Sequence, residues 1–88
     1  MTPVSSVTAF LARAQSGADR EAADLLAALD LDDEARAAVD ARSVSPAERL
    51  RRMEARTGRT WTDAQLAHVE SRAMVAIRRH LQAKGLYA

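Results

Sequence analysis

Apolar residues recur every three or four positions along most of the chain, which is the spacing of one face of a helix. No stretch alternates apolar and polar residues convincingly enough for a strand. We therefore expect an all-α fold, a small bundle of four to five helices with a long C-terminal helix, in one domain over residues 1–88. The predicted segments are 2–17, 19–30, a short helix after Asp32 or Asp33, 45–58 and 63–84.

Residues with helix-capping chemistry mark the ends of these segments. Side chains suited to an N-cap stand at the predicted starts: Thr2 (before Pro3), Asp19, Asp32 or Asp33, Ser45 and Thr62. Glu48 follows Ser45, and Gln65 follows Thr62, by the three positions of a capping box. Glycines follow three of the segments: Gly17, Gly58 and Gly85. Leu86 can then fold back on Leu81, as in a Schellman motif.

The chain's only tryptophan, Trp61, stands directly before the Thr62 cap. Leu66 lies four positions after that cap, which is the spacing of a hydrophobic staple. The pattern predicts that Trp61 fixes how the chain enters the last helix. The alternative is an exposed aromatic side chain that grips a ligand or a base.

The last predicted helix has an apolar face and a charged face. The apolar face carries Leu66, Val69, Ala73, Met74, Ile77 and Leu81, and the opposite face carries His68, Arg72, Val75 and Arg79. The charged face is either ordinary solvated surface or a contact stripe for a partner or for phosphates, and Val75 among the cations is the argument for a contact. Glu70 lies near the apolar face. Because an unpaired buried carboxylate is very costly, we expect it to meet an arginine from segment 45–58 or from a neighbouring subunit.

Charge is distributed unevenly along the chain. Residues 1–41 contain 3 basic and 8 acidic residues, net −5, whereas residues 42–88 contain 10 basic and 4 acidic, net +6. The densest basic patch is Arg49, Arg52 and Arg56 on one helix face, with Arg51 and Arg59 nearby. Either this basic half meets an anionic surface, of nucleic acid or of an acidic protein, or the acidic helices neutralise it within the fold or across a dimer.

Composition limits the core and the compartment. The 22 large apolar residues beside 20 alanines are few for 88 residues, so self-association or a partner is expected to complete the core. No apolar run is long enough to span a membrane, and no export signal is recognisable, so we expect a cytoplasmic protein. Twelve arginines against one lysine are typical of a GC-rich genome, and arginine abundance alone does not indicate nucleic-acid binding.

Catalytic and metal sites are not expected from the residue spacing. The absence of cysteine excludes thiol catalysis and thiolate ligands. His68 and His80 are 12 positions apart, about 120° around a helix, and cannot chelate one ion. Ala35 and Ala41 stand where a calcium loop needs glycine and glutamate. With no phosphate-binding glycine loop and no serine beside a suitable base, we expect neither an enzyme nor a cofactor.

The segment WTDAQLAHVESRAMVAIRRHL, residues 61–81, resembles the last helix of the promoter-binding helix-turn-helix of bacterial sigma factors. The likeness lies in Glu70-Ser71-Arg72-Ala73-Met74 and in the following Ile77-Arg78-Arg79. It implies that segment 45–58 supports a recognition helix whose first turns enter the major groove. The residues that would then face DNA are Asp63, Ala64, Gln65, Ala67 and His68, which are poor in cations, and the connection from Met53 to Thr62 is long for this motif.

These observations favour a small, non-catalytic bacterial or phage protein that docks onto a larger protein assembly as an adaptor, inhibitor or accessory subunit. The residues expected to make the contact are Arg49, Arg52, Arg56, Arg59, His68, Arg72, Val75 and Arg79. The alternative is a DNA-binding helix-turn-helix regulator that uses the same residues. A small subunit of an enzyme complex is a third class that the sequence leaves open.

Overall fold

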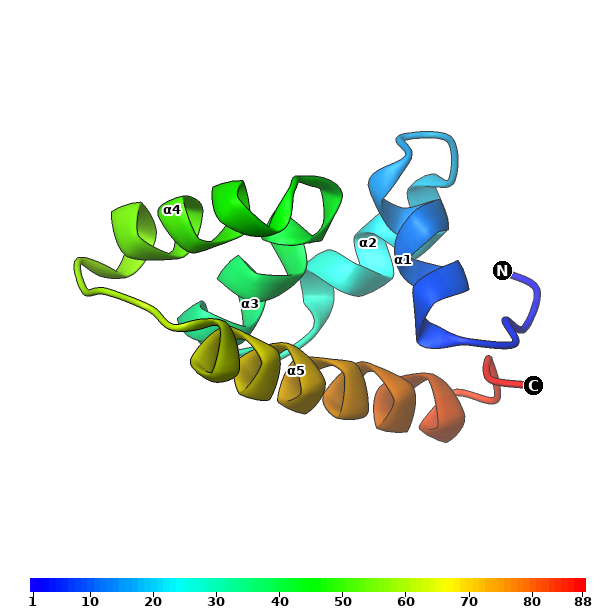
Figure 1. Cartoon of the computed structure of the whole chain (residues 1–88). Helices are drawn as coiled ribbons and strands as arrows, with labels where there is room; N and C mark the ends of the chain where they lie inside the picture. The colour runs from blue at the N-terminus through cyan, green and yellow to red at the C-terminus, as the bar shows by residue number, and fades with distance from the viewer. The chain divides into compact units, whose positions relative to one another are not determined.

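The computed structural model describes all of residues 1–88 and contains five α-helices and one 3-10 helix (Figure 1). They are α1 (Val7–Gln15), α2 (Arg20–Ala28), α3 (Asp33–Asp40), the 3-10 helix η1 (Ala41–Ser43), α4 (Pro46–Thr57) and α5 (Asp63–Ala83). The predicted all-α fold of four to five helices with a long C-terminal helix is therefore confirmed. No helix combines the length and the apolar character that crossing a membrane requires.

The helices group into two compact units. The terminal unit comprises Met1–Asp30 and Val75–Ala88, and the central unit comprises Leu31–Met74. The first part of α5 belongs to the central unit and its last part to the terminal unit. The change from acidic to basic sequence after residue 41 falls inside the central unit, so charge and packing divide the chain at different places.

In the terminal unit, α1 packs against α2, and the two chain ends meet (Figure 1). Val4 forms an isolated parallel bridge with Tyr87. The Val4 N–H donates to the Leu86 carbonyl at 2.9 Å, and the Ala88 N–H donates to the Val4 carbonyl at 2.8 Å. The core of this unit includes the buried side chains of Phe10, Leu11, Leu26, Ile77 and Leu81.

This bridge corrects the predicted start of the first helix. The Thr2-Pro3 pair does not begin a helix, because Val4 is extended and bonded to the C-terminal residues. The N-cap is Ser6, whose hydroxyl accepts the Ala9 N–H at 3.0 Å. Residues 2–6 of the predicted segment therefore precede the helix, and Val4 pairs with the C-terminal residues instead of forming part of a helical face.

In the central unit, α3 packs against η1 and α4, and three of the four buried residues of α3 are alanines. Of the two candidate caps, Asp32 and Asp33, it is Asp32 that caps α3, by accepting the Ala35 N–H at 2.8 Å. The buried residues of α3 and η1 are Ala35, Ala37, Ala38, Val39 and Ala41, and α4 contributes Met53. Side chains this small allow the backbones of neighbouring helices to approach closely.

Both predicted ends of the last helix are confirmed. The Thr62 N–H donates to the Gln65 side chain at 3.0 Å, and the Gln65 N–H donates to the Thr62 hydroxyl at 3.2 Å, which completes the capping box. At the other end Gly85 has φ 69°. The Leu86 N–H reaches the Leu81 carbonyl at 2.8 Å, as a Schellman motif requires.

Two helix ends differ from the prediction. α2 ends at Ala28 rather than near Asp30, because Leu29 turns to an extended conformation that buries its side chain. At the start of α4 the Ser45 hydroxyl accepts the Glu48 N–H at 3.4 Å, but the Glu48 carboxylate lies against Arg51 and Arg52 instead of reaching back to Ser45. Only half of that capping box forms.

Met53 tests the packing of the central unit, since its side chain is fully buried. We expect Met53→Ala to lower the free energy of unfolding by about 2–5 kcal/mol, because it removes buried apolar atoms and leaves a cavity. Val75→Ala, at an exposed position, should change it by less than about 0.5 kcal/mol. Urea denaturation followed by far-UV circular dichroism measures both. Equal effects of the two substitutions would contradict this packing.

Candidate functional site

The arginines of α4 do not form one uniform patch. Arg49 is held by its own chain: its Nε donates to the Val44 carbonyl at 3.0 Å and its Nη2 donates to the Arg42 carbonyl at 2.9 Å. Its Nη1 also lies 3.9 Å from a Glu70 carboxylate oxygen. Arg49 therefore braces the junction of η1 with α4, and little of its hydrogen-bonding capacity is left for a partner.

Arg52 and Arg56 are more accessible than Arg49. Arg56 forms an ion pair with Asp40 at 2.8 Å, and both side chains are about half exposed, at 45% and 53%. Arg52 lies 3.6 Å from a Glu48 carboxylate oxygen, one turn earlier on the same helix, and is also about half exposed. Exposed pairs of this kind stabilise a fold only weakly.

These two arginines border a hollow of about 360 Å³ on the central unit, which we call the α3–α4 groove. Three small residues, Ala37, Ala41 and Ala55, line it together with Asp40, Arg52 and Arg56. Because the alanine side chains end at Cβ, the lining is shallow and apolar between charged side chains. The groove combines an apolar contact area with two guanidinium groups, a combination that the sequence pattern did not reveal.

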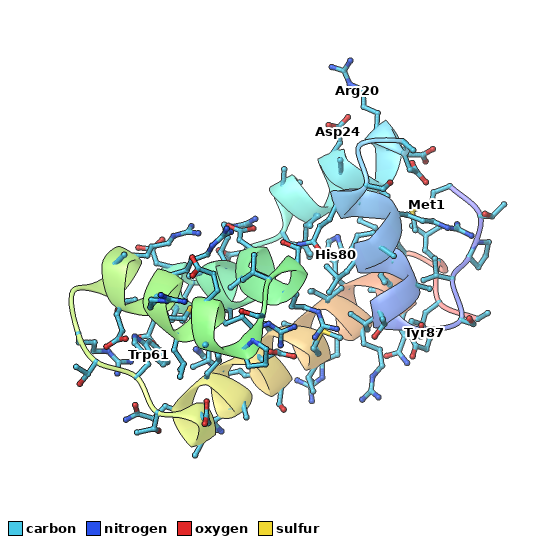
Figure 2. The ribbon with its side chains drawn as sticks, turned by 45° about the horizontal axis from the view of Figure 1, so that its top comes forward. Met1, Arg20, Asp24, Trp61, His80 and Tyr87 are labelled. Carbon is cyan, nitrogen blue, oxygen red and sulfur yellow. The ribbon has the colours of Figure 1, made fainter.

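A second hollow of about 350 Å³ lies beside Trp61 on the same unit. Trp61 is buried near the α4–α5 loop, and its indole N–H donates to the Thr57 hydroxyl at 2.8 Å (Figure 2). The Arg59 guanidinium lies 3.9 Å from the centre of the indole ring and pairs with Glu34 at 3.2 Å. The indole ring is thus buried and not exposed, which is contrary to the alternative of an exposed aromatic side chain, and Arg59 covers the ring.

Arg72, on the charged face of α5, pairs with Asp32 at 2.6 Å. The Asp32 carboxylate accepts the Ala35 N–H as well, so one side chain both caps α3 and binds α5. The Ala35 N–H, followed by the Arg72 guanidinium, holds the pKa of Asp32 below its usual range. Both interactions favour the charged carboxylate.

Glu70 pairs with an arginine, as expected, but its nearest partner comes from η1 and not from segment 45–58. The nearest cation is Arg42 of η1 at 2.6 Å, while Arg49 of α4 lies at 3.9 Å. The Glu70 and Arg42 side chains are each 23% exposed, so this is the least solvated ion pair between side chains. The sequence predicted the need for an arginine but not the contribution of the 3-10 turn.

The remaining predicted contact residues lie on the exposed side of α5. His68 and Arg72 are exposed on the central unit, and Val75 and Arg79 are exposed on the terminal unit. Val75, at 38% exposure, is the one large apolar side chain on the surface. The expected core residues Leu66, Val69, Ala73, Ile77 and Leu81 are buried, and Met74 is partly buried.

The acidic helix α3 neutralises much of the basic segment that follows it. Three ion pairs within the central unit join acidic residues 32–40 to basic residues 56–72: Asp32–Arg72, Glu34–Arg59 and Asp40–Arg56. Neutralisation within the fold, one of the two interpretations of the charge pattern, therefore accounts for these arginines. Arg51, at 72% exposure, is the most solvated of the ion-paired arginines, and its only ion pair is with Glu48 on its own helix.

No protein-family model matches the chain, and no curated protein sequence or solved structure does so either. The resemblance to sigma factors stays a prediction. α4 continues to Thr57, which leaves only Gly58–Thr62 between α4 and α5, a shorter connection than the one expected from Met53. No group of three histidine or acidic side chains is placed to hold a metal ion.

Arg49 is expected to matter for stability. Arg49→Met leaves two backbone carbonyls without their side-chain donor and weakens the surroundings of Glu70, so we expect a loss of about 1–3 kcal/mol in the free energy of unfolding. Arg51→Met is the matched control, because Arg51 is exposed, and it should cost less than about 0.5 kcal/mol. Chemical denaturation distinguishes the two. If Arg49→Met left the free energy of unfolding unchanged, Arg49 would not brace this junction.

The stability of the fold is expected to depend on pH through Asp32. Its pKa is lower in the folded state than in the unfolded chain, so its contribution to stability is present above the usual aspartate range and is lost as pH falls through the lowered value. Asp32→Asn keeps a capping oxygen but does not titrate. We expect thermal unfolding between neutral pH and about pH 3 to show a smaller loss of stability in the variant. If the parent protein and Asp32→Asn lost the same stability as pH falls, the pH dependence would not arise from Asp32.

Proposed function

We propose that this chain is a non-catalytic docking module that binds a larger protein, as an adaptor, inhibitor or accessory subunit. The α3–α4 groove carries the proposal. Its lining consists of three small apolar residues and two accessible arginines, with a single acidic side chain. Apolar area beside arginine is the composition that protein interfaces favour.

The shape of the groove suits a helix or another close-fitting segment. Helices pack at interaxial distances of about 8–10 Å, and small residues at the contact permit the closest approach. Of the three alanines in the lining, Ala37 and Ala41 are buried and Ala55 is exposed, so Ala55 supplies most of the accessible apolar area and no large apolar side chain fills the groove. A partner that inserts into this groove therefore gains contact area without displacing any large side chain.

The exposed face of α5 supplies a second candidate contact. Val75 is apolar and accessible, and Arg79, four residues later on the same helix face, is exposed as well. An exposed valine alone is ordinary, so this face supports the proposal less strongly than the groove does.

The apolar part of the groove lining favours protein over nucleic acid as the partner, because phosphate contacts need cations and not apolar area. Arg56, Arg59 and Arg72 each have a carboxylate within 3.2 Å, and any anionic group of a partner, phosphate or carboxylate, has to compete with it. DNA binding by a helix-turn-helix made from α4 and α5 is the alternative. It predicts a steep loss of affinity with salt.

Affinity capture from native lysate, with and without nuclease, tests the proposal through Ala55→Gln. This substitution adds a larger, uncharged side chain to the groove. Overpacking costs about 1–3 kcal/mol, which corresponds to a loss of affinity of roughly tenfold or more. We expect a partner protein to remain bound to the parent protein after nuclease treatment. We expect Ala55→Gln to lose this partner. Ala12→Gln, at an exposed alanine of α1, is the matched control and should retain it. Circular dichroism shows whether both variants keep the fold.

Two other outcomes contradict the groove. If Ala55→Gln captured the partner as well as the parent protein does, and Val75→Asp failed to capture it, the contact surface would be the exposed face of α5. Recovery of nucleic acid, with companion proteins lost on digestion and binding that weakens by orders of magnitude with salt, would establish the DNA-binding alternative.

A further inference from the structure

We propose that the α3–α4 groove receives an acidic α-helix of the partner, and that a partner carboxylate replaces Asp40 at Arg56. This inference rests on the proposed docking function and adds the chemistry of the partner. It also assigns Asp40 a role, that of an internal competitor for the binding site.

Charge complementarity identifies an acidic occupant. The groove is lined by two arginines and one aspartate, and α4 as a whole carries four arginines against two glutamates. With Arg56 paired to Asp40, the remaining positive charge lies at Arg52 and its neighbour Arg51, because these two arginines share the single carboxylate of Glu48. A basic segment would meet repulsion from Arg52 there, whereas an acidic segment meets attraction.

The spacing of the two arginines suits a helix. Arg52 and Arg56 are four positions apart on α4, which places them one helical turn, roughly 6 Å, from each other along its axis. A second helix packed along α4 presents glutamates at the same separation when they recur four positions apart. Each guanidinium offers several N–H donors in a planar arrangement that matches a carboxylate.

The internal pairs of these arginines are easily exchanged. The Arg56–Asp40 pair is about half exposed, and the Arg52–Glu48 contact is 3.6 Å long. Neither arginine donates to a backbone carbonyl in the way that Arg49 does. Both guanidiniums can therefore turn to a partner carboxylate at little expense to the fold.

Asp40 consequently weakens the site that it occupies. Its carboxylate neutralises Arg56 in the free protein and has to leave before a partner carboxylate binds. Asp40→Asn removes the charge but preserves the size of the side chain. The variant should bind an acidic helix more tightly, and this gain should require Arg56.

The probe is an end-capped, alanine-based helical peptide of roughly 18 residues with glutamates four positions apart on one face. The control peptide has lysine in place of each glutamate. The full chain, labelled at its alanine methyl groups, is titrated with each peptide and followed by NMR. We expect the acidic peptide to shift the signals of Ala37, Ala41 and Ala55, and the basic peptide to leave them unchanged.

Affinities measured by fluorescence anisotropy then test the exchange. We expect Asp40→Asn to tighten binding of the acidic peptide about two- to fivefold, which is the range of an exposed ion pair. Arg56→Gln should weaken binding by a similar factor or more, and Asp40→Asn should have no effect in the Arg56→Gln background. Arg78→Gln, an exposed arginine of the terminal unit, changes net charge equally and controls for long-range attraction.

Three results overturn the inference: equal binding of the two peptides, shifts confined to residues outside the groove, or an Asp40→Asn gain that persists without Arg56. Tighter binding of duplex DNA than of the acidic peptide, with the same dependence on Arg56, would replace the acidic helix by phosphate. If these peptide results fail while Ala55→Gln still abolishes capture of the cellular partner, the docking function stands and only its acidic chemistry is wrong.

Discussion

The ion pair between the Glu70 carboxylate and Arg42 is the interaction on which the central unit most depends. The carboxylate lies on the inner side of α5, largely withdrawn from solvent, and therefore requires a cation. Arg42 of η1 supplies that cation, and Arg49 of α4 approaches the same carboxylate. Since Arg49 also binds the carbonyls of Arg42 and Val44, one network fixes the turn between α3 and α4. The position of that turn determines the groove between the two helices.

Small core residues make such a network necessary. Three of the four buried residues of α3 are alanines, and alanine gains less from burial than larger apolar residues do. The elements of the central unit are held partly by ion pairs instead, through Asp32, Glu34 and Asp40. These pairs are exposed and individually weak. The arginines that join the elements of the central unit thus keep their guanidinium groups at its surface.

The same arginines therefore have different roles that their sequence positions do not distinguish. Arg49, Arg52 and Arg56 have equivalent places on one helix face, yet Arg49 is bound to backbone carbonyls and the other two border an accessible groove. Arg59 covers Trp61, which makes it part of the packing at the α4–α5 loop. Contacts between elements, rather than position on the helix, distinguish the arginine that the backbone holds from those that stay exposed.

Several features could be predicted from residues close together in the chain: the helical periodicity, the Asp19 and Thr62 caps, a cap at Asp32 or Asp33, and the glycines that end helices. These features arise from interactions within one or two turns, so local residue order specifies them. The pairing of Val4 with the C-terminal residues and the ion pair of Arg42 with Glu70 could not be predicted in this way. The tertiary structure also placed the alanine-lined groove beside Arg52 and Arg56. The physical reason is that these contacts join residues far apart in the chain, and many arginines and carboxylates could have paired equally well by charge alone.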